Sequence, residues 1–201
     1  MRIGEIIETT SVAFVAESLE LNRPPPLGSL VTVRVPEGSS CIDVYAVVTH
    51  GQTLGLDPSR RALRRSTDTV FDGAVYDENP ELLHVLRTEF SAALVGFYAE
   101  GHIRQHLPPQ PPPLHFSVLS TSAEDVLRFT GSLHYFRQLL TASAPVPPQQ
   151  VLAANIREVF RERGNDHAWL RAAAREIAAL LRDDHEALLT ILYTIDPGVQ
   201  Q

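Results

Sequence analysis

Apolar and polar residues alternate in short runs along the first half of the chain, and this period of two is typical of half-buried β-strands. In residues 30–35, Leu30, Thr32 and Arg34 alternate with three valines. Turn-forming stretches rich in Pro, Gly, Asn and Asp separate this run from its neighbours. Short strands at this spacing predict a small antiparallel β-barrel or sandwich. Comparable runs occupy residues 2–8, 12–21 and 43–50.

A helical signal interrupts this strand pattern near residue 80. Asn79 is a favourable N-cap, and Pro80 would occupy the first helical position, where its missing N–H costs nothing. A short inserted helix is therefore expected here. The strand pattern then resumes as a hairpin over residues 91–107 and a short strand over residues 114–120.

Beyond Leu119 the apolar residues recur every three or four positions, which is typical of amphipathic helices. Thr121 with Glu124 forms a capping box, and Asp166 is the expected cap of a later helix. The spacing predicts about four helices, with a proline-rich break near residues 144–148. Their apolar stripes are expected to be core.

These patterns together predict an α+β protein. Residues 1–119 are expected to form a β domain, a small antiparallel barrel with one short inserted helix. Residues 120–201 are expected to form a helical region. The 44% hydrophobic content is enough to build a proper core.

Composition limits the environment and the chemistry. The net charge is −7, and all 17 basic residues are arginine, so no Schiff base or P-loop lysine is available. Cys41 is the single cysteine, which fits a reducing compartment. No apolar run approaches the ~20 residues that span a bilayer, and no secretion signal is seen at the start. We expect a cytoplasmic protein with no membrane contact.

Sequence motifs for common catalytic chemistry are missing. The chain has no Walker A sequence, no Rossmann glycine fingerprint, no G-x-S-x-G and no H-E-x-x-H. His102 and His106 are four apart but lie in a predicted strand, where four residues span about 13 Å, too far for one metal ion. We expect no catalytic residue, no metal and no cofactor. An enzyme whose site is assembled only by the fold stays an alternative.

One basic patch stands out in this acidic protein. Arg60, Arg61, Arg64 and Arg65 fall within six residues. The guanidinium group of arginine forms paired hydrogen bonds with phosphates and with carboxylates, so the patch could bind nucleic acid or an acidic partner. A solvated loop without a partner is the simpler alternative.

A run of prolines lies between two predicted strands. It comprises Pro108, Pro109, Pro111, Pro112 and Pro113. Proline cannot supply a ladder N–H, so the run is expected to be a stiff polyproline II connector. Such a connector is exposed and rigid, and a contact arm for a partner is the alternative.

The strand half also carries four placed motifs: Ile-Gly at 3–4, Phe-Val at 14–15, Leu-Gly-Ser-Leu-Val at 27–31 and Tyr-Ala-Val-Val at 45–48. With these motifs the first 60 residues resemble the HAS-barrel, and the likeness continues loosely to the end of the strand region. The HAS-barrel is the small β-barrel shared by HerA-type DNA-processing ATPases and the ATP synthase ring subunits.

The resemblance implies a role in assembly. In that family the barrel is a collar on the ATPase ring and a surface for partners such as a nuclease, while the ATPase domain carries catalysis. Here helices follow the barrel instead. We therefore expect a non-catalytic interaction or assembly module that docks on a protein partner or ring complex, with a homo-oligomer as an alternative. A nucleic-acid-binding barrel that uses the arginine patch is the second hypothesis.

Overall fold

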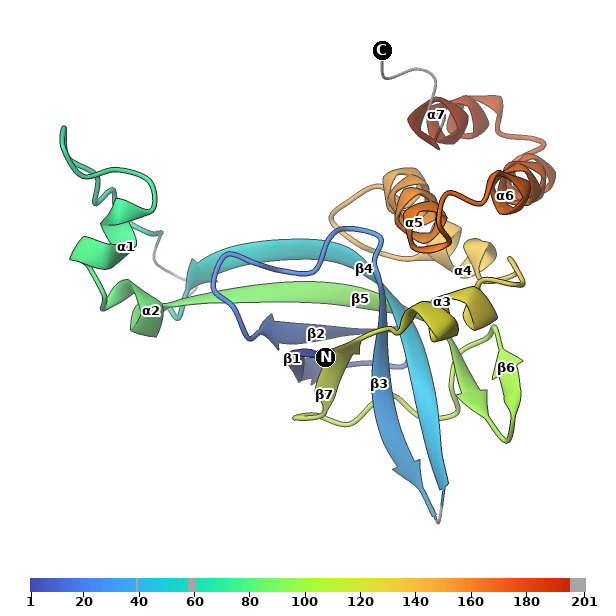
Figure 1. Cartoon of the computed structure of the whole chain (residues 1–201), viewed down its shortest axis with the longest axis horizontal. Coiled ribbons are helices and arrows are strands. Elements are labelled where there is room, and N and C mark those ends of the chain that lie inside the picture. The colour runs from blue at the N-terminus through green and yellow to red at the C-terminus, as the bar shows by residue number, and fades with distance from the viewer. Residues whose placement is uncertain (39, 58–60, 196–201) are drawn as a thin grey trace.

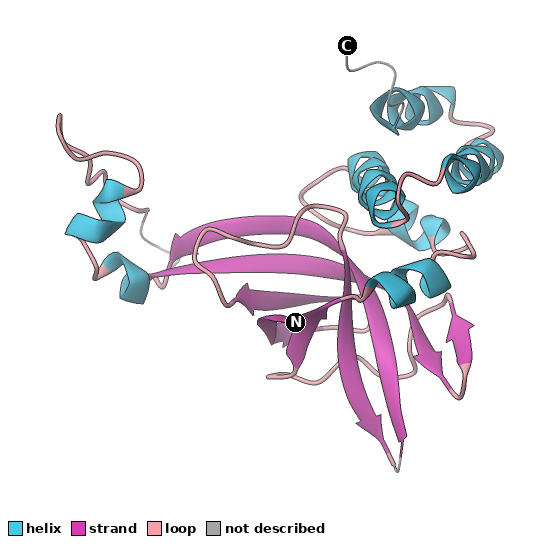
Figure 2. Ribbon diagram, in the orientation of Figure 1, coloured by secondary structure: helices cyan, strands magenta, loops and turns pink. Residues whose placement is uncertain are grey.

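The computed structural model describes residues 1–38, 40–57 and 61–195. Within these residues the first half of the chain is mainly β-structure and the second half helical (Figure 1, Figure 2). The strands are β1 (Arg2–Thr9), β2 (Ala13–Ser18), β3 (Leu30–Glu37), β4 (Ser40–Gly55), β5 (Leu86–Ala99), β6 (His102–Arg104) and β7 (Ser117–Ser120). The helices are α1 (Ala74–Glu78), α2 (Leu82–Val85), α3 (Ala123–Phe129), α4 (Phe136–Thr141), α5 (Pro148–Glu162), α6 (His167–Leu180) and α7 (His185–Ile195).

Six of the strands close into an antiparallel barrel. Their order is β2-β1-β7-β3-β4-β5, and β5 returns to β2, with Phe14 opposite Ala92. β6 pairs with β5 and extends the sheet outside this ring. The expected α+β class and the barrel are thus confirmed, and the sandwich alternative is wrong. Closure also removes the exposed edges that an open sheet of these strands would carry.

The last strand of the barrel lies between two of the first. β7 pairs with β1 on one side, where Val118 is opposite Gly4, and with β3 on the other, where Val118 is opposite Val33. The proline-containing segment leads the chain to this position. The barrel therefore depends on a pairing between residues that are more than 80 positions apart, and a pattern of local alternation cannot predict such an order.

β4 is buried on both of its faces. Val44, Ala46 and Val48 point into the barrel, whereas Tyr45 and Val47 belong to a second core that the helices cover. This strand has a near-continuous apolar run because both of its faces are buried. The helical region therefore packs directly on the barrel, and α5 is its central element.

A hydrogen-bonded contact joins α5 to the barrel at Gly28. The Nδ2 of Asn155 donates to the Gly28 carbonyl at 2.8 Å, and the Tyr135 hydroxyl donates to the Asn155 Oδ1 at 2.9 Å. Both side chains are fully buried. Burial raises the pKa of Tyr135, so the phenol keeps the proton that it donates. Each polar atom of this contact thereby has a hydrogen-bond partner, which offsets the desolvation penalty of its burial.

Helix α3 begins with a cap other than the expected one. Ser122, not Thr121, is the N-cap, and its Oγ accepts from the Asp125 N–H at 3.1 Å. The predicted capping box of Thr121 with Glu124 is therefore wrong. The physical reason is that the Thr121 hydroxyl is hydrogen-bonded to the Thr32 hydroxyl of β3 at 2.8 Å, so a contact with the barrel replaces the helix cap.

The inserted helical segment contains two short helices. Asn79 does not start a helix as predicted, because its Nδ2 donates back to the Val75 carbonyl at 2.9 Å, and it ends α1. α2 begins later, at Leu82. In the C-terminal region the predicted cap Asp166 is confirmed, since its Oδ1 accepts from the backbone N–H groups of Ala168 and Trp169.

The Gly28 contact can be tested by one substitution with a matched control. Gly28 has a φ of +85°, and a Cβ there would lie 2.3 Å from the Asn155 backbone nitrogen. Gly101 has a φ of +82° with nothing within 4 Å of a Cβ. We expect Gly28→Ala to lower the free energy of unfolding by about 1–3 kcal/mol more than Gly101→Ala, because α5 has to move. Urea unfolding measures both; equal losses would show that the close approach contributes nothing.

Candidate interaction site

The longest hairpin of the barrel carries a projecting insertion. β4 and β5 have 16 and 14 residues, and their distal ends run on as a two-stranded ribbon, with Thr53 opposite Thr88 and Gly55 opposite Leu86 (Figure 1). Residues 56–85 follow the ribbon and are called the arm below. Figure 1 shows the arm at one end of the molecule and the C-terminal helices at the other.

The arm contributes little to either core. Among its described residues Leu82 is the one buried side chain, and α1 buries none. Residues 61–67 form no helix or strand, and a turn follows in which the Thr67 N–H donates to the Val70 carbonyl at 2.8 Å. A segment with so few buried contacts adds little to the stability of the barrel.

A small polar network holds the arm against the barrel. Asn22, in the loop between β2 and β3, donates from Nδ2 to the Tyr76 hydroxyl of α1 at 2.7 Å. Its backbone N–H donates to the Thr88 hydroxyl, also at 2.7 Å, and the Thr53 and Thr88 hydroxyls lie 2.8 Å apart. At the base of the arm, the Leu56 N–H donates to the Val85 carbonyl. These bonds fix where α1 lies relative to the ribbon.

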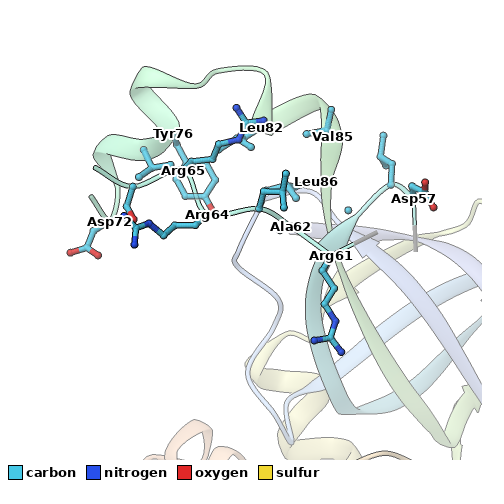
Figure 3. A pocket seen from close by; sticks show the side chains of 15 residues that line it. Asp57, Arg61, Ala62, Arg64, Arg65, Asp72, Tyr76, Leu82, Val85 and Leu86 are labelled. Atoms are coloured by element: carbon cyan, nitrogen blue, oxygen red, sulfur yellow. The ribbon is translucent and has the colours of Figure 1, made fainter. Parts of the chain in front are cut away.

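The arm forms a shallow hollow of about 740 Å³ that is open to solvent and lined mainly by apolar side chains (Figure 3). Tyr76, Leu82 and Leu86 line it from the two helices and the start of β5. Several large apolar side chains of the arm are exposed, inside and beside this hollow, with exposed fractions from 45% to 82%. They are Leu56, Leu63, Phe71, Leu83 and Val85.

Three of the four arginines of the predicted patch line the same hollow. Arg65 makes a long ion pair with Glu81, at 3.4 Å, and both side chains are about half exposed. Arg61 and Arg64 have no ionic or hydrogen-bonded partner in the described part of the chain, and Figure 3 shows Arg61 pointing away from the two helices. Arg60 lies outside the described residues. The structure thus joins the arginines to an apolar surface, which the sequence interpretation missed.

The proline segment is partly built into the fold. Pro108 and Pro112 are buried, whereas Pro109, Pro111 and Pro113 are exposed. Each P-x-x-P pair, 108 with 111 and 109 with 112, therefore has one member that the protein itself covers. Beyond the prolines the chain bonds to β1, because the His115 N–H donates to the Ile6 carbonyl at 2.9 Å. Pro108 and Pro112 are thus built into the fold. Contact with a partner stays a prediction for Pro109, Pro111 and Pro113.

The other residues considered as metal ligands or reactive groups do not come together in one site. His102 lies in β6 and His106 beyond it, and no group of three or more His, Cys, Asp or Glu side chains in residues 1–38, 40–57 and 61–195 could hold a metal ion. Cys41 is exposed in β4. Asp184 caps α7, since its Oδ1 accepts from the Ala187 N–H at 3.0 Å.

Comparison with known proteins does not assign the chain to a group. No protein-family model matches the sequence, and no curated protein matches it either. Over the part of the chain that the structure describes, no helix has both the length and the apolar character needed to span a bilayer. The site must therefore be interpreted from its own residues.

The anchoring of the arm can be measured by hydrogen exchange. Tyr76→Phe removes the hydroxyl that accepts from Asn22, and one such bond contributes about 1 kcal/mol. We expect the amides of α1 to exchange about fivefold faster, with no change in β1 and β7. The matched control is Tyr193→Phe, since Tyr193 is 64% exposed and far along the chain in α7. Unchanged exchange in α1, or equal acceleration throughout the barrel, would contradict this role.

Proposed function

We propose that this protein is a non-catalytic interaction module that docks on a protein partner or a ring complex through its arm. The observation that carries the proposal is the group of five exposed large apolar side chains on the arm. Contiguous exposed apolar surface is costly for a protein that works alone and marks contact sites in soluble proteins. The arm is also the part of the molecule that stands farthest from the helical layer (Figure 1).

The composition of the arm favours a protein partner over nucleic acid. A phosphate backbone needs several cations that are free of nearby anions. Here five carboxylates in residues 61–85 accompany the arginines of the arm, and exposed leucines would be placed against a charged polymer. A protein surface can satisfy both the apolar and the charged groups. The carboxylates are Asp68, Asp72, Asp77, Glu78 and Glu81.

The closed barrel supports a more specific form of the proposal. It is consistent with the HAS-barrel resemblance, in which the barrel is a collar on a ring ATPase and contacts a nuclease. We propose that this chain has the collar role in the cytoplasm, and that any ATP hydrolysis belongs to its partner. Assembly of the chain with copies of itself is the alternative within the same class.

Removing the arm tests the proposal. Gly55 and Leu86 are paired, so an Asn-Gly turn can join them in place of residues 56–85. We expect the unmodified protein, purified gently from its own cells, to carry a partner at fixed stoichiometry in native mass spectrometry. The shortened protein should lose that partner and still unfold cooperatively, with a free energy of unfolding no more than about 3 kcal/mol below that of the parent, since Leu82 is the one buried side chain among the described residues of the arm.

Three results would count against it. A partner that stays bound to the shortened protein would place docking elsewhere, for example on the exposed prolines. A bare monomer from both proteins would remove the assembly role. Turnover of nucleotide or cleavage of DNA by the purified chain would contradict the non-catalytic part of the proposal.

Nucleic-acid binding is the second candidate because Arg61 and Arg64 have no ionic partner among the residues that the structure describes. If these arginines neutralise phosphates, log K against log salt should have a slope of about −2 for the pair, and it should flatten when both are changed to Ala. We expect instead no binding of a 20-nucleotide DNA, single or double stranded, in fluorescence anisotropy at physiological salt. Binding that weakens steeply with added salt and is lost when both arginines are changed to Ala would favour this second function over the first.

A further inference from the structure

We infer that the hollow in the arm binds a short acidic segment of the partner, in which an apolar side chain enters the hollow and carboxylates pair with Arg61 and Arg64. This inference rests on the proposed function and gives the chemistry of the partner. It follows from the size of the hollow, from the surface around it and from its unpaired charges.

The size and surroundings of the hollow indicate a chain segment as the occupant. Its volume is about 740 Å³, and it is open to solvent, so an occupant is covered by the protein on one side only. Phe71 and Leu83 lie outside the lining and are also exposed, by 59% and 57%. An occupant that fills the hollow alone would leave these side chains in water. A peptide segment reaches both, because it continues on either side of the residue that enters the hollow.

The charges of the lining select an acidic segment. Arg61 and Arg64 have no partner among the described residues, and Arg65 is held only by a partly exposed pair with Glu81 at 3.4 Å. Guanidinium groups form paired, charge-assisted hydrogen bonds with carboxylates. A basic segment would instead leave like charges facing one another, which is costly at an interface.

The lining also limits how acidic the segment can be. Asp72 belongs to it, so a uniformly acidic peptide would face a like charge there. The best match has carboxylates beside Arg61 and Arg64 and apolar side chains over Leu56 and Tyr76. Alternation of acidic and apolar residues is therefore the expected pattern, and a plain run of aspartates or glutamates is not.

Selection from a display library of random 12-residue peptides on the full-length protein tests this inference. We expect the enriched peptides to combine Asp or Glu with Leu, Ile or Phe within three positions, and the shortened protein without the arm to enrich none of them. A fluorescein-labelled synthetic copy of the most enriched peptide then gives a Kd by anisotropy.

Charge reversal identifies the pairing residues. R61E/R64E should weaken this peptide at least tenfold, and a copy with its acidic residues changed to Lys should regain affinity for that variant. The matched control is R171E/R175E, which makes the same charge change on the exposed face of α6, at the opposite end of the molecule (Figure 1). This control should leave the Kd within twofold.

Several outcomes would overturn the inference. It would be overturned by enriched peptides without acidic residues, by no enrichment at all, or by an equal loss of affinity in the control variant. Self-association of the parent that the shortened protein lacks would identify a second copy as the occupant instead. If the native partner is lost with the arm but the selected peptides are not acidic, the docking proposal stands and only its chemistry is wrong.

Discussion

The two halves of this molecule meet tightly at Gly28, where the backbone of α5 lies against the entrance to β3. Only a residue without a Cβ fits there, and the Gly28 carbonyl is satisfied by the buried amide of Asn155. This contact fixes α5, and α5 in turn packs on α4, α6 and α7. The outward faces of β4 and β5 are then covered, so these strands are held from both sides.

That double cover has a consequence for the arm. A strand that is packed on both faces is a rigid support, and β4 and β5 keep their pairing beyond the barrel as far as Gly55 and Leu86. The arm is attached through this paired ribbon, in which residues 51–53 of β4 are exposed, and the hydrogen bonds of Asn22 with Tyr76 and Thr88 hold α1 in place. A partner that binds the arm does not have to order its attachment to the barrel, which reduces the entropic cost of association.

Local features of the fold could be predicted from the sequence, and distant ones could not. The strand predicted at residues 30–35 and the cap at Asp166 depend on near neighbours, and both predictions are confirmed. The caps proposed at Thr121 and Asn79 are wrong because a partner outside the expected motif, Thr32 for the first and the Val75 carbonyl for the second, takes the side chain. The arginine patch could be located in the sequence. The apolar lining around it could not, because it comes from loop residues and short helices with no common period.

The position of β7 bears on how this chain is made. Synthesis proceeds from the N-terminus, and β1, β2 and β3 emerge long before Ser117. Until β7 arrives, the edges of β1 and β3 that will receive it have unpaired backbone groups and can pair with other chains. The nascent barrel is thus open for the time needed to translate more than 80 residues after β3, and its safe folding depends on delaying edge-to-edge association over that interval.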